Sequence, residues 1–349
     1  MFMEPKYALI GCGSISPFHF NGLRKVGGKI VRVVDIDVAK ASRMAEPFGA
    51  KVGADFREAL ADPEVTVVSV LTTAKFHPEM CLAALDAGKD VICEKTLGRT
   101  VEDALTIVKA AKASKQLFFT AYMKRFFPAV VKAKELLPSL GKLFSVHART
   151  WQCWGDMYNM HDPSKLDYVT ENHGSPSLKC CGSHIIDGLL NLLGRPKSVY
   201  GKVDYIGGSD VADRKAIALL EYEGSLVVSF EAATHPLKKI GFERNSWDER
   251  IEINGTEGRI DLLTPMWDHS DRNSARLIHY SNATMTSTEY CFDAVTPFDF
   301  EVAYFHECLM RREQGRPDVV DGLCVDVVID GIQQSHRQRR AIDLDYRGY

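Results

Sequence analysis

The sequence lacks the features that mark a membrane, secreted or nucleic-acid-binding protein. None of its apolar stretches approaches the roughly 20 residues of a membrane span, and Met1–Gly11 has no signal-peptide layout. With a formal net charge of −3 and a pI near 6.4, neither nucleic acid nor an anionic membrane is an expected partner. The one basic run, His336–Arg340, is typical of the solvated end of a helix. Internal repeats, low-complexity tracts and flexible linkers are absent from the sequence.

Paired cysteine spacings are also missing. The chain has nine cysteines, but none shows the spacing of a metal site. The adjacent Cys180 and Cys181 come shortly before His184, yet neighbouring cysteines do not have ordinary zinc spacing. The cysteines are typical of reduced thiols, most of them in the core. We therefore expect a cytoplasmic protein with no bound metal.

A short apolar strand at Lys6–Ile10 leads directly into a glycine loop. Gly11 permits a tight turn, and Gly13 lets the backbone approach a pyrophosphate at the start of the next helix. The third position of the G-x-G-x-x-G pattern is Ser16 rather than glycine, so the match is imperfect. The cofactor-binding residues predicted from this loop are Gly11, Gly13, Ser14 and Ile15.

A second strand, Ile30–Val34, ends in Asp35, about twenty residues after the glycine loop. An acidic side chain at this place accepts hydrogen bonds from the ribose hydroxyls of a dinucleotide. Because Asp35 would also repel a 2′-phosphate, the sequence predicts NAD in preference to NADP. The alternative is a glycine turn followed by an unrelated surface aspartate, and the order of strand, loop, helix, strand and acid argues against it.

Further candidates follow the third and fourth strands. The strand Asp90–Glu94 ends immediately before Lys95, and ligands of an open parallel sheet bind beyond the carboxyl ends of its strands. Lys95 is therefore expected to touch whatever reacts with the cofactor. Glu94 is predicted to orient Lys95 or the cofactor, or to be a structural acid at a strand end. Thr72 and His77 are predicted to lie near the cofactor, with capping or packing as the alternative for His77.

At 349 residues the chain is long enough for two domains. Strands and helices alternate in its first third, which predicts a doubly wound parallel sheet. Pro78 suits a first helical position, and Thr100–Asp103 resembles a capping box. Alternating segments then predict a second, mainly antiparallel sheet with one open face, followed by two helices. We predict an α/β protein with a Rossmann domain at residues 1–123 and an α/β domain at residues 124–349. The predicted strands are Lys6–Gly11, Ile30–Asp35, Val65–Leu71, Asp90–Glu94 and Leu117–Tyr122 in the first domain, and Leu143–Trp151, Ser198–Ile206, Lys215–Glu221, Leu226–Ala232, Arg250–Asn254 and Arg259–Leu263 in the second.

The stretch Lys179–Gly194 supplies the main candidates of the second domain. His184, Asp187 and Asn191 are spaced at i, i+3 and i+7, so they share one face of a helix whose other face is apolar. Such a face, beginning at a glycine turn, either lines a cleft or is the satisfied polar flank of a buried helix.

Six motifs are specific through their order and spacing: GCGSISPFH, HPEMCLAALDAGKDVICEK, KRFFPAV, GKLFSVHAR, GSHIIDGLLNLLG and NGTEGRIDL. Together they resemble the Gfo/Idh/MocA family of glucose-fructose oxidoreductases, inositol dehydrogenases and rhizopine-catabolism proteins. The resemblance covers nearly the whole chain. It implies NAD(P)-dependent oxidation or reduction of sugars, inositols and related polyols. It also implies a homodimer or homotetramer formed through the open sheet of the second domain.

The resemblance assigns roles to two residues. Lys95 corresponds to the lysine of the family's E-K-P segment, which touches both cofactor and substrate hydroxyl. His184 corresponds to the histidine assigned as acid and base, a role that suits an unperturbed pKa of about 6.5. Lys95 is expected to stabilise alkoxide character or to relay the proton.

This chain departs from the family pattern at two positions. Thr96 replaces the usual proline after Glu-Lys, so we expect no cis-proline turn. Cys180 replaces an aspartate four residues before His184 that contacts substrate or tunes the histidine. Asp187 or a loop residue is a candidate to compensate.

The sequence thus predicts an NAD-dependent dehydrogenase that oxidises a secondary hydroxyl of a cyclic polyol or sugar. The alternatives are a redox-neutral NAD-dependent glycosidase and a non-catalytic NAD- and sugar-binding regulator. Trp151 and Trp154 offer apolar faces to a sugar ring or pack within their loop, and Arg125 meets substrate or anchors the domain junction. The sequence does not choose among inositols, free sugars, sugar acids and nucleotide sugars. The predicted substrate-binding residues are Lys95, Arg125, Trp151, Trp154, Cys180, His184 and Asp187.

Overall fold

The computed structural model describes residues 4–153, 163–206, 209–269 and 271–349. The chain forms two compact units. The first comprises the chain up to Met123 together with Phe298–Asp326, and the second comprises Lys124–Pro297 and Val327–Tyr349. Within the described ranges, no helix has both the length and the apolar character that crossing a membrane would require.

The first unit is built on a parallel sheet. Its strands are β1 (Lys6–Ile10), β2 (Lys29–Val34), β3 (Lys51–Gly53), β4 (Val67–Val70), β5 (Asp90–Glu94) and β6 (Phe118–Ala121). Its helices are α1 (Ser16–Lys25), α2 (Val38–Ala45), α3 (Phe56–Ala61), α4 (His77–Asp86), α5 (Val101–Ala113), α9 (Pro297–Arg311) and the first part of α10 (Val319–Gln338). The strand order β3-β2-β1-β4-β5-β6 is that of a Rossmann fold, which confirms the predicted fold class.

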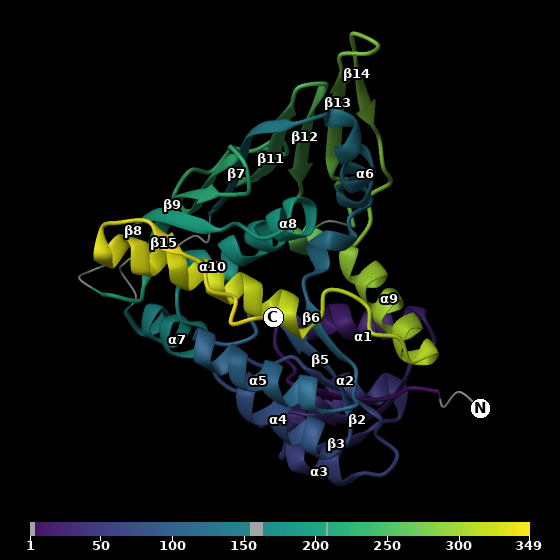
Figure 1. The fold of residues 1–349 in the computed structure, drawn as a ribbon. Coiled ribbons are helices and arrows are strands. Elements are labelled where there is room, and N and C mark those ends of the chain that lie inside the picture. The colour runs from purple at the N-terminus through teal and green to yellow at the C-terminus, as the bar shows by residue number, and fades with distance from the viewer. Residues whose placement is uncertain (1–3, 154–162, 207–208, 270) are drawn as a thin grey trace. The chain divides into compact units, whose positions relative to one another are not determined.

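Helices cover both faces of this sheet (Figure 1). For this reason every residue of β4, β5 and β6 is buried, and the three strands are mostly apolar rather than alternating. The predicted capping box is present at the start of α5, where Thr100 and Asp103 each accept a hydrogen bond from the other's backbone N–H. These local signals place the carboxyl end of β5, and therefore Lys95, at the edge of the sheet where ligands bind.

The segment 298–326 returns to the first unit, so the predicted second domain of residues 124–349 is interrupted. Phe298 stacks on Phe18 of α1 and Phe305 on Phe119 of β6, with ring centroids 4.6 and 4.7 Å apart. Residues 314–318 also run beside the edge strand β6, where the Phe118 N–H donates to Gln314 Oε1 at 2.9 Å. Edge strands carry unpaired backbone groups, and this segment satisfies those of β6.

The second unit contains a larger mixed sheet. Its strands are β7 (Leu143–Gln152), β8 (Ser198–Tyr205), β9 (Asp213–Glu221), β10 (Val227–Thr234), β11 (Trp247–Gly255), β12 (Gly258–Thr264), β13 (Arg276–Ser281), β14 (Thr286–Tyr290) and β15 (Ile342–Asp343). Its helical segments include η2 (Met123–Phe126), α6 (Pro128–Leu136), α7 (Pro163–His173), the π-helical η5 (Pro176–Gly182) and α8 (Ser183–Leu193). The order is β14-β13-β12-β11-β7-β10-β9-β8-β15. Among the described strand pairs of this second sheet, only β7 and β10 are parallel, which confirms a mainly antiparallel sheet.

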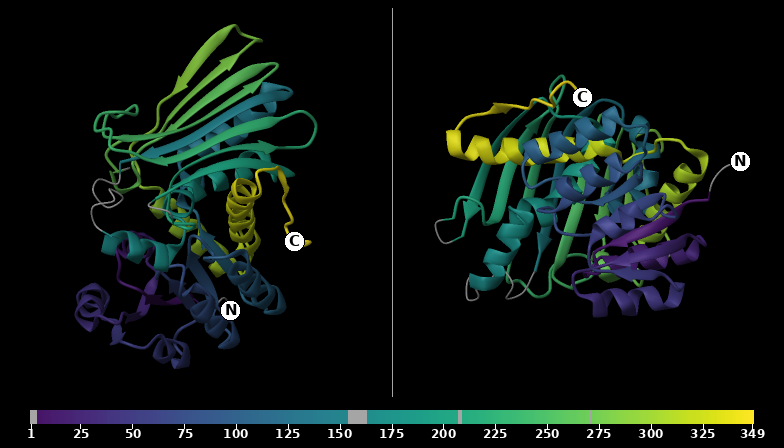
Figure 2. Two further views of the ribbon diagram at one scale, coloured as in Figure 1. Left: turned by 90° about the vertical axis from the view of Figure 1, so that its left-hand side faces the viewer. Right: turned by 90° about the horizontal axis from the view of Figure 1, so that it is seen from below.

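The two faces of this sheet differ. Helix α8 and segment η5 pack on one face, which we call the inner face (Figure 2). A Cβ at Gly182 would lie 3.1 Å from the Phe230 ring, and one at Gly188 would lie 3.4 Å from Ile251, so these strand residues mark the inner face. On the outer face, Ile217 and other large apolar side chains are exposed. The predicted open face is therefore present.

Candidate active site

Gly11 and Gly13 form the turn between β1 and α1 for different reasons. Gly11 has a φ of 102°, and a Cβ there would lie 2.8 Å from the Leu71 carbonyl oxygen. Only glycine fits this position. At Gly13, a Cβ would meet no protein atom within 4 Å. Protein packing does not require glycine at Gly13, whereas close approach of a ligand to the backbone does.

The start of α1 suits an anionic group. Ser16 is fully buried, and its hydroxyl donates to the Gly13 carbonyl at 2.8 Å, so a small side chain serves in place of the third glycine. Ile15 stands at the N-cap and supplies no side-chain cap to the first N–H groups of the helix. Free N–H groups and the partial positive charge at a helix start favour a pyrophosphate. Together with the open space at Gly13, these residues fit a dinucleotide.

Asp35 lies beside the glycine loop and is held by two backbone groups. Its Oδ2 accepts from the Cys12 N–H at 2.7 Å, and its Oδ1 accepts from the Asp37 N–H at 2.8 Å. Burial and the neighbouring Asp35 raise the pKa of the Cys12 thiol to about 12, so this thiol stays protonated at neutral pH. A fixed carboxylate at this place suits ribose hydroxyls and opposes a 2′-phosphate.

Both carboxylate oxygens of Glu94, the last residue of β5, accept hydrogen bonds from the protein. His19 Nε2 donates to Oε1 at 2.9 Å, and the Lys95 N–H donates to Oε2 at 3.1 Å. Burial raises the pKa of Glu94, but the hydrogen bond from His19 and the charge of Lys95 together bring it below its ordinary value. Glu94 is thus an ionised group that fixes the backbone of the half-buried Lys95.

The turn after Lys95 is tied to α10. Thr96 is buried, and its hydroxyl donates to the Gly98 carbonyl at 3.1 Å. The Gly98 N–H donates to the buried Asp326 at 3.0 Å. The Lys95–Thr96 peptide bond is cis. A cis turn is therefore present without proline, contrary to the expectation from the sequence.

His77 packs between two strand ends. It is fully buried, with Nε2 3.1 Å from the Thr72 carbonyl oxygen and Nδ1 2.9 Å from the Thr96 carbonyl oxygen. Burial lowers the pKa of His77 despite these two carbonyls. The ring therefore joins the loop after β4 to the turn after β5, which favours the packing role over direct contact with a cofactor.

His184 lies in the first turn of α8, directly after the π-helical η5, and is 8% exposed. Short π-helical segments are rare and occur often at functional sites. The start of η5 is anchored by Asp213 on β9, whose carboxylate accepts the N–H groups of Ser177 and Leu178, both at 2.9 Å. Burial raises the pKa of Asp213 to about 6, although these hydrogen bonds favour its ionised form.

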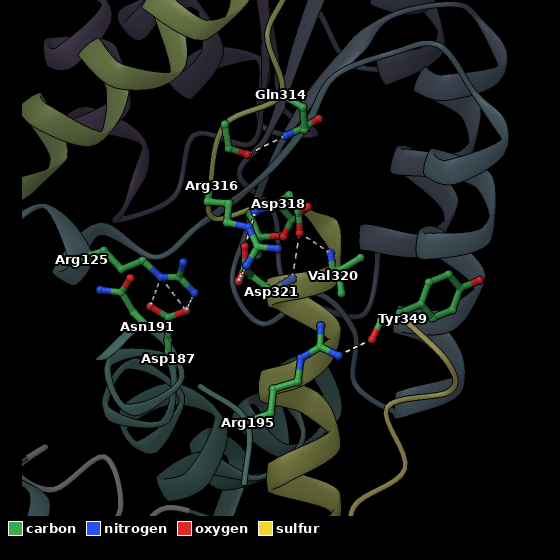
Figure 3. Close-up of polar contacts among 12 residues, drawn as sticks. Arg125, Asp187, Asn191, Arg195, Gln314, Arg316, Asp318, Val320, Asp321 and Tyr349 are labelled. Carbon is green, nitrogen blue, oxygen red and sulfur yellow. Dashed lines mark hydrogen bonds and ion pairs between the residues drawn. The ribbon is translucent and has the colours of Figure 1, made fainter. Parts of the chain in front are cut away.

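The predicted polar face of α8 meets cations of the preceding segments. Asp187 forms a buried bidentate ion pair with Arg125 of η2, with Nε–Oδ2 and Nη2–Oδ1 distances of 2.8 and 2.5 Å (Figure 3). Asn191 accepts from Lys134 of α6 at 2.8 Å. The structure therefore pairs two predicted substrate residues, Arg125 and Asp187. For Asp187 and Asn191, this geometry favours the alternative in which they form the hydrogen-bonded polar flank of a buried helix over the one in which they line a cleft.

The other predicted substrate residues lie apart. Cys180 is half-buried within η5, on the segment that leads to His184. Trp151 alternates with the inner-face residues Thr150 and Gln152, so its side chain lies on the outer face, where Arg149 stacks on its ring at 4.7 Å. The structure thus does not bring Trp151 to His184. Trp154 lies outside the described residues.

Two comparisons with known sequences decide the family. Residues 5–122 match the description "Oxidoreductase family, NAD-binding Rossmann fold", and residues 130–261 match "GFO/IDH/MocA C-terminal domain". Inositol 2-dehydrogenase of Acidothermus cellulolyticus is 38% identical over 352 residues, which cover 97% of this chain and 94% of that protein. The chain belongs to the Gfo/Idh/MocA family. It is an oxidoreductase with an NAD-binding Rossmann domain.

Two further matches have narrower meaning. Inositol 2-dehydrogenase 3 of Saccharopolyspora erythraea is 36% identical over 142 residues, so the match spans 40% of this chain and 42% of that protein. A solved structure, "Levoglucosan dehydrogenase, complex with NADH and levoglucosan", superposes with a TM-score of 0.85 and 22% identity. It covers 98% of this chain and 100% of that one. At this identity it shows the Gfo/Idh/MocA fold alone.

Sequence reasoning missed several supporting residues of this Gfo/Idh/MocA chain. His19 and Asp326 hold the strand end and turn around Lys95, and Asp213 holds η5, but each is distant in sequence from its partner. Lys124 could have been identified from the sequence, because it precedes Arg125 in the KRFFPAV motif. Its buried partner Glu249 had no local signal, because alternation along β11 predicts only that it faces inward. Among the described residues, no group of three or more His, Cys, Asp or Glu side chains is arranged to hold a metal ion.

Proposed function

We propose that this protein is an NAD-dependent dehydrogenase that oxidises a secondary hydroxyl of a cyclic polyol or sugar. The observation that carries the proposal is the placement of Lys95. It follows β5 at the carboxyl edge of an NAD-binding sheet, and its backbone is fixed by the ionised Glu94. A cation fixed there is suited to stabilise negative charge that develops on a substrate oxygen.

Lys95 and His184 are assigned the proton chemistry. Bound NAD would supply the acceptor for the hydride of the carbinol carbon. Lys95 stabilises the alkoxide character of the substrate oxygen, and the His184 imidazole takes up the hydroxyl proton. A neutral imidazole near pH 7 is competent for that step because its unperturbed pKa is about 6.5. Gly11, Gly13 and Asp35 bind the cofactor, and Asp35 favours NAD over NADP.

The substrate class is inferred from the relatives. The match that spans nearly the whole chain is named an inositol 2-dehydrogenase, and the superposed structure is a complex with levoglucosan. A cyclic polyol or sugar is common to both. Cys180, in place of the family's aspartate, removes one acceptor beside His184 and makes this position a determinant of which hydroxyl pattern is bound.

We also infer a homodimer or homotetramer formed through the outer face of the larger sheet. In support, apolar side chains on that face are 40–46% exposed and lie on neighbouring strands. Patches of this kind mark association surfaces. All nine cysteines are thiols rather than disulfides, which supports a cytoplasmic protein. The apolar residues concerned are Tyr200, Ile217, Leu219 and Val227.

The test is NADH formation against a panel of inositols, aldoses, sugar acids and glycosides, with NAD and with NADP. We expect one polyol class to give NADH, and Lys95→Ala to abolish this turnover while binding of NAD is retained. Lys115→Ala, an exposed lysine in the same unit, is the matched control and should keep full activity. Bound NAD without net NADH, but with cleavage of a glycoside, would instead show the redox-neutral glycosidase. Binding of NAD and sugar with no turnover would show a regulator.

A further inference from the structure

Glu249 is the centre of a polar cluster on the inner face of the larger sheet. Its side chain has no exposed surface. The carboxylate accepts hydrogen bonds from Thr150 Oγ1 at 2.6 Å and from Gln152 Nε2 at 2.9 Å. It also accepts one from Thr264 Oγ1 at 3.0 Å and forms an ion pair with Lys124. With four donors around two oxygens, its position on β11 is fixed.

Lys124 and Arg125 connect this cluster to α8. Lys124 is buried against Glu249, and its ammonium lies 5.5 Å from the centre of the Trp247 ring. Arg125, the next residue, forms the bidentate ion pair with Asp187 on α8 (Figure 3). Two consecutive side chains of η2 therefore bind the sheet and the helix. Glu249 and α8 are thus connected through one short backbone segment.

His184 lies one helical turn before Asp187 on the same face of α8, so the two side chains are neighbours. Glu249 and Asp187 carry negative charges and Lys124 and Arg125 carry positive charges, which leaves the cluster neutral. The inner face of β7 adds no ionisable side chain. Other ionisable groups on the described elements that contact α8 or η5 are Lys179, Cys180 and Cys181 on η5, Lys132, Lys134 and Glu135 on α6, and Asp213 on β9.

We infer that Glu249 and Lys124 are positioning residues for His184, which fix α8 and balance the charge around its imidazole. Loss of the carboxylate removes one negative charge from beside the buried Lys124 ammonium. The added positive potential opposes protonation of His184. Loss of the ammonium removes a positive charge from the same cluster and has the opposite effect on the protonation of His184. The inference rests on the proposed function only where a shifted His184 pKa is expected to change dehydrogenase turnover.

The experiment follows the protonation of His184 by NMR of histidine-labelled full-length protein, with its signal assigned by its absence in His184→Gln. We expect Glu249→Gln to lower the titration midpoint by roughly half a pH unit or more, and Lys124→Met to raise it. Asp248→Asn is the matched control, because Asp248 is also buried and ion-paired but lies one residue away on the outer face. It should leave the midpoint unchanged.

The inference is overturned when Glu249→Gln or Lys124→Met is folded and titrates like the wild type, or when Asp248→Asn shifts the midpoint equally. If Glu249→Gln does not fold, the opposite shift in Lys124→Met decides. The titration needs no substrate. A shift without dehydrogenase turnover would therefore support the positioning role and reject the proposed function, whereas turnover without a shift would do the reverse.

Discussion

Replacing Asp213 by asparagine should change how stability depends on pH. Asp213 is completely buried at the start of β9, where it accepts the N–H groups of Ser177 and Leu178 and so anchors η5. Burial raises the pKa of its carboxyl from 3.8 to about 6 in the folded protein. Because the folded state holds this proton more tightly than the unfolded state, protonation favours folding.

The size of the effect follows from the shift. A difference of roughly 2 pKa units at 1.36 kcal/mol each corresponds to about 3 kcal/mol. This stabilisation is fully present below the unfolded pKa of 3.8 and is lost as the pH rises through the folded value of about 6. Between about pH 5 and about pH 7.5, the loss is about 1.4 kcal/mol. The amide introduced by Asp213→Asn does not titrate, so this part of the pH dependence should vanish in the variant.

Urea unfolding at a series of pH values measures the difference. We expect the free energy of unfolding of the wild type, relative to Asp213→Asn, to fall by about 1.4 kcal/mol from about pH 5 to about pH 7.5. Asp210→Asn, an exposed neighbour in sequence, is the control and should show a difference that is flat with pH. A flat difference for Asp213→Asn, or one that grows with pH, would refute the reasoning and make Asp213 a charged cap.

Four further substitutions test the site. Gly13→Ala should weaken NAD binding by about tenfold or more without lowering Tm. Gly11→Ala should destabilise the fold by more than about 1 kcal/mol, because of these two glycines only Gly11 has a positive φ and a close neighbour. Fluorescence titration with NADH and thermal unfolding separate the two effects. Arg125→Met leaves the Asp187 carboxylate buried without its counter-charge and should cost about 3–5 kcal/mol in urea unfolding, so a loss under about 1 kcal/mol would contradict that environment. Glu94→Gln removes the ionised acceptor that fixes the Lys95 backbone, so steady-state kinetics should show a turnover at least about tenfold lower with little change in NAD affinity; unaltered turnover would reject the orienting role.

Local patterns were enough to predict most strands of the fold. Asp90–Glu94 was predicted with the bounds that β5 has, because a fully buried parallel strand is an apolar run with clear ends. The missed strands carry no such signal. β13 (Arg276–Ser281) buries a single residue and β14 (Thr286–Tyr290) is almost wholly exposed. β3 (Lys51–Gly53) and β15 (Ile342–Asp343) have only three and two residues. Each of them is fixed by pairing with a neighbour rather than by its own composition.

Long-range contacts explain what the sequence could not predict. Phe298 and Phe305 look like ordinary residues of an amphipathic helix, and nothing local indicates that they pack on the first unit. The i, i+3, i+7 spacing correctly grouped three polar residues of α8, but it does not reveal that Arg125 pairs with Asp187. Spacing identifies a shared face, whereas the partner of that face depends on the tertiary fold.

The contacts that hold the two proposed proton-transfer residues are separate. Those described around Lys95 come from His19, Glu94 and the Gly98–Asp326 bond, all within the first unit. Those described around α8 come from η2, α6, β9 and the sheet of the second unit. Thr96 replaces the family's proline in the turn after Lys95, and Cys180 replaces its aspartate on the segment before His184. These two positions are held by different sets of described contacts. Restoring proline and aspartate singly and together should therefore give additive changes in the activation free energy, which steady-state kinetics of the three variants checks.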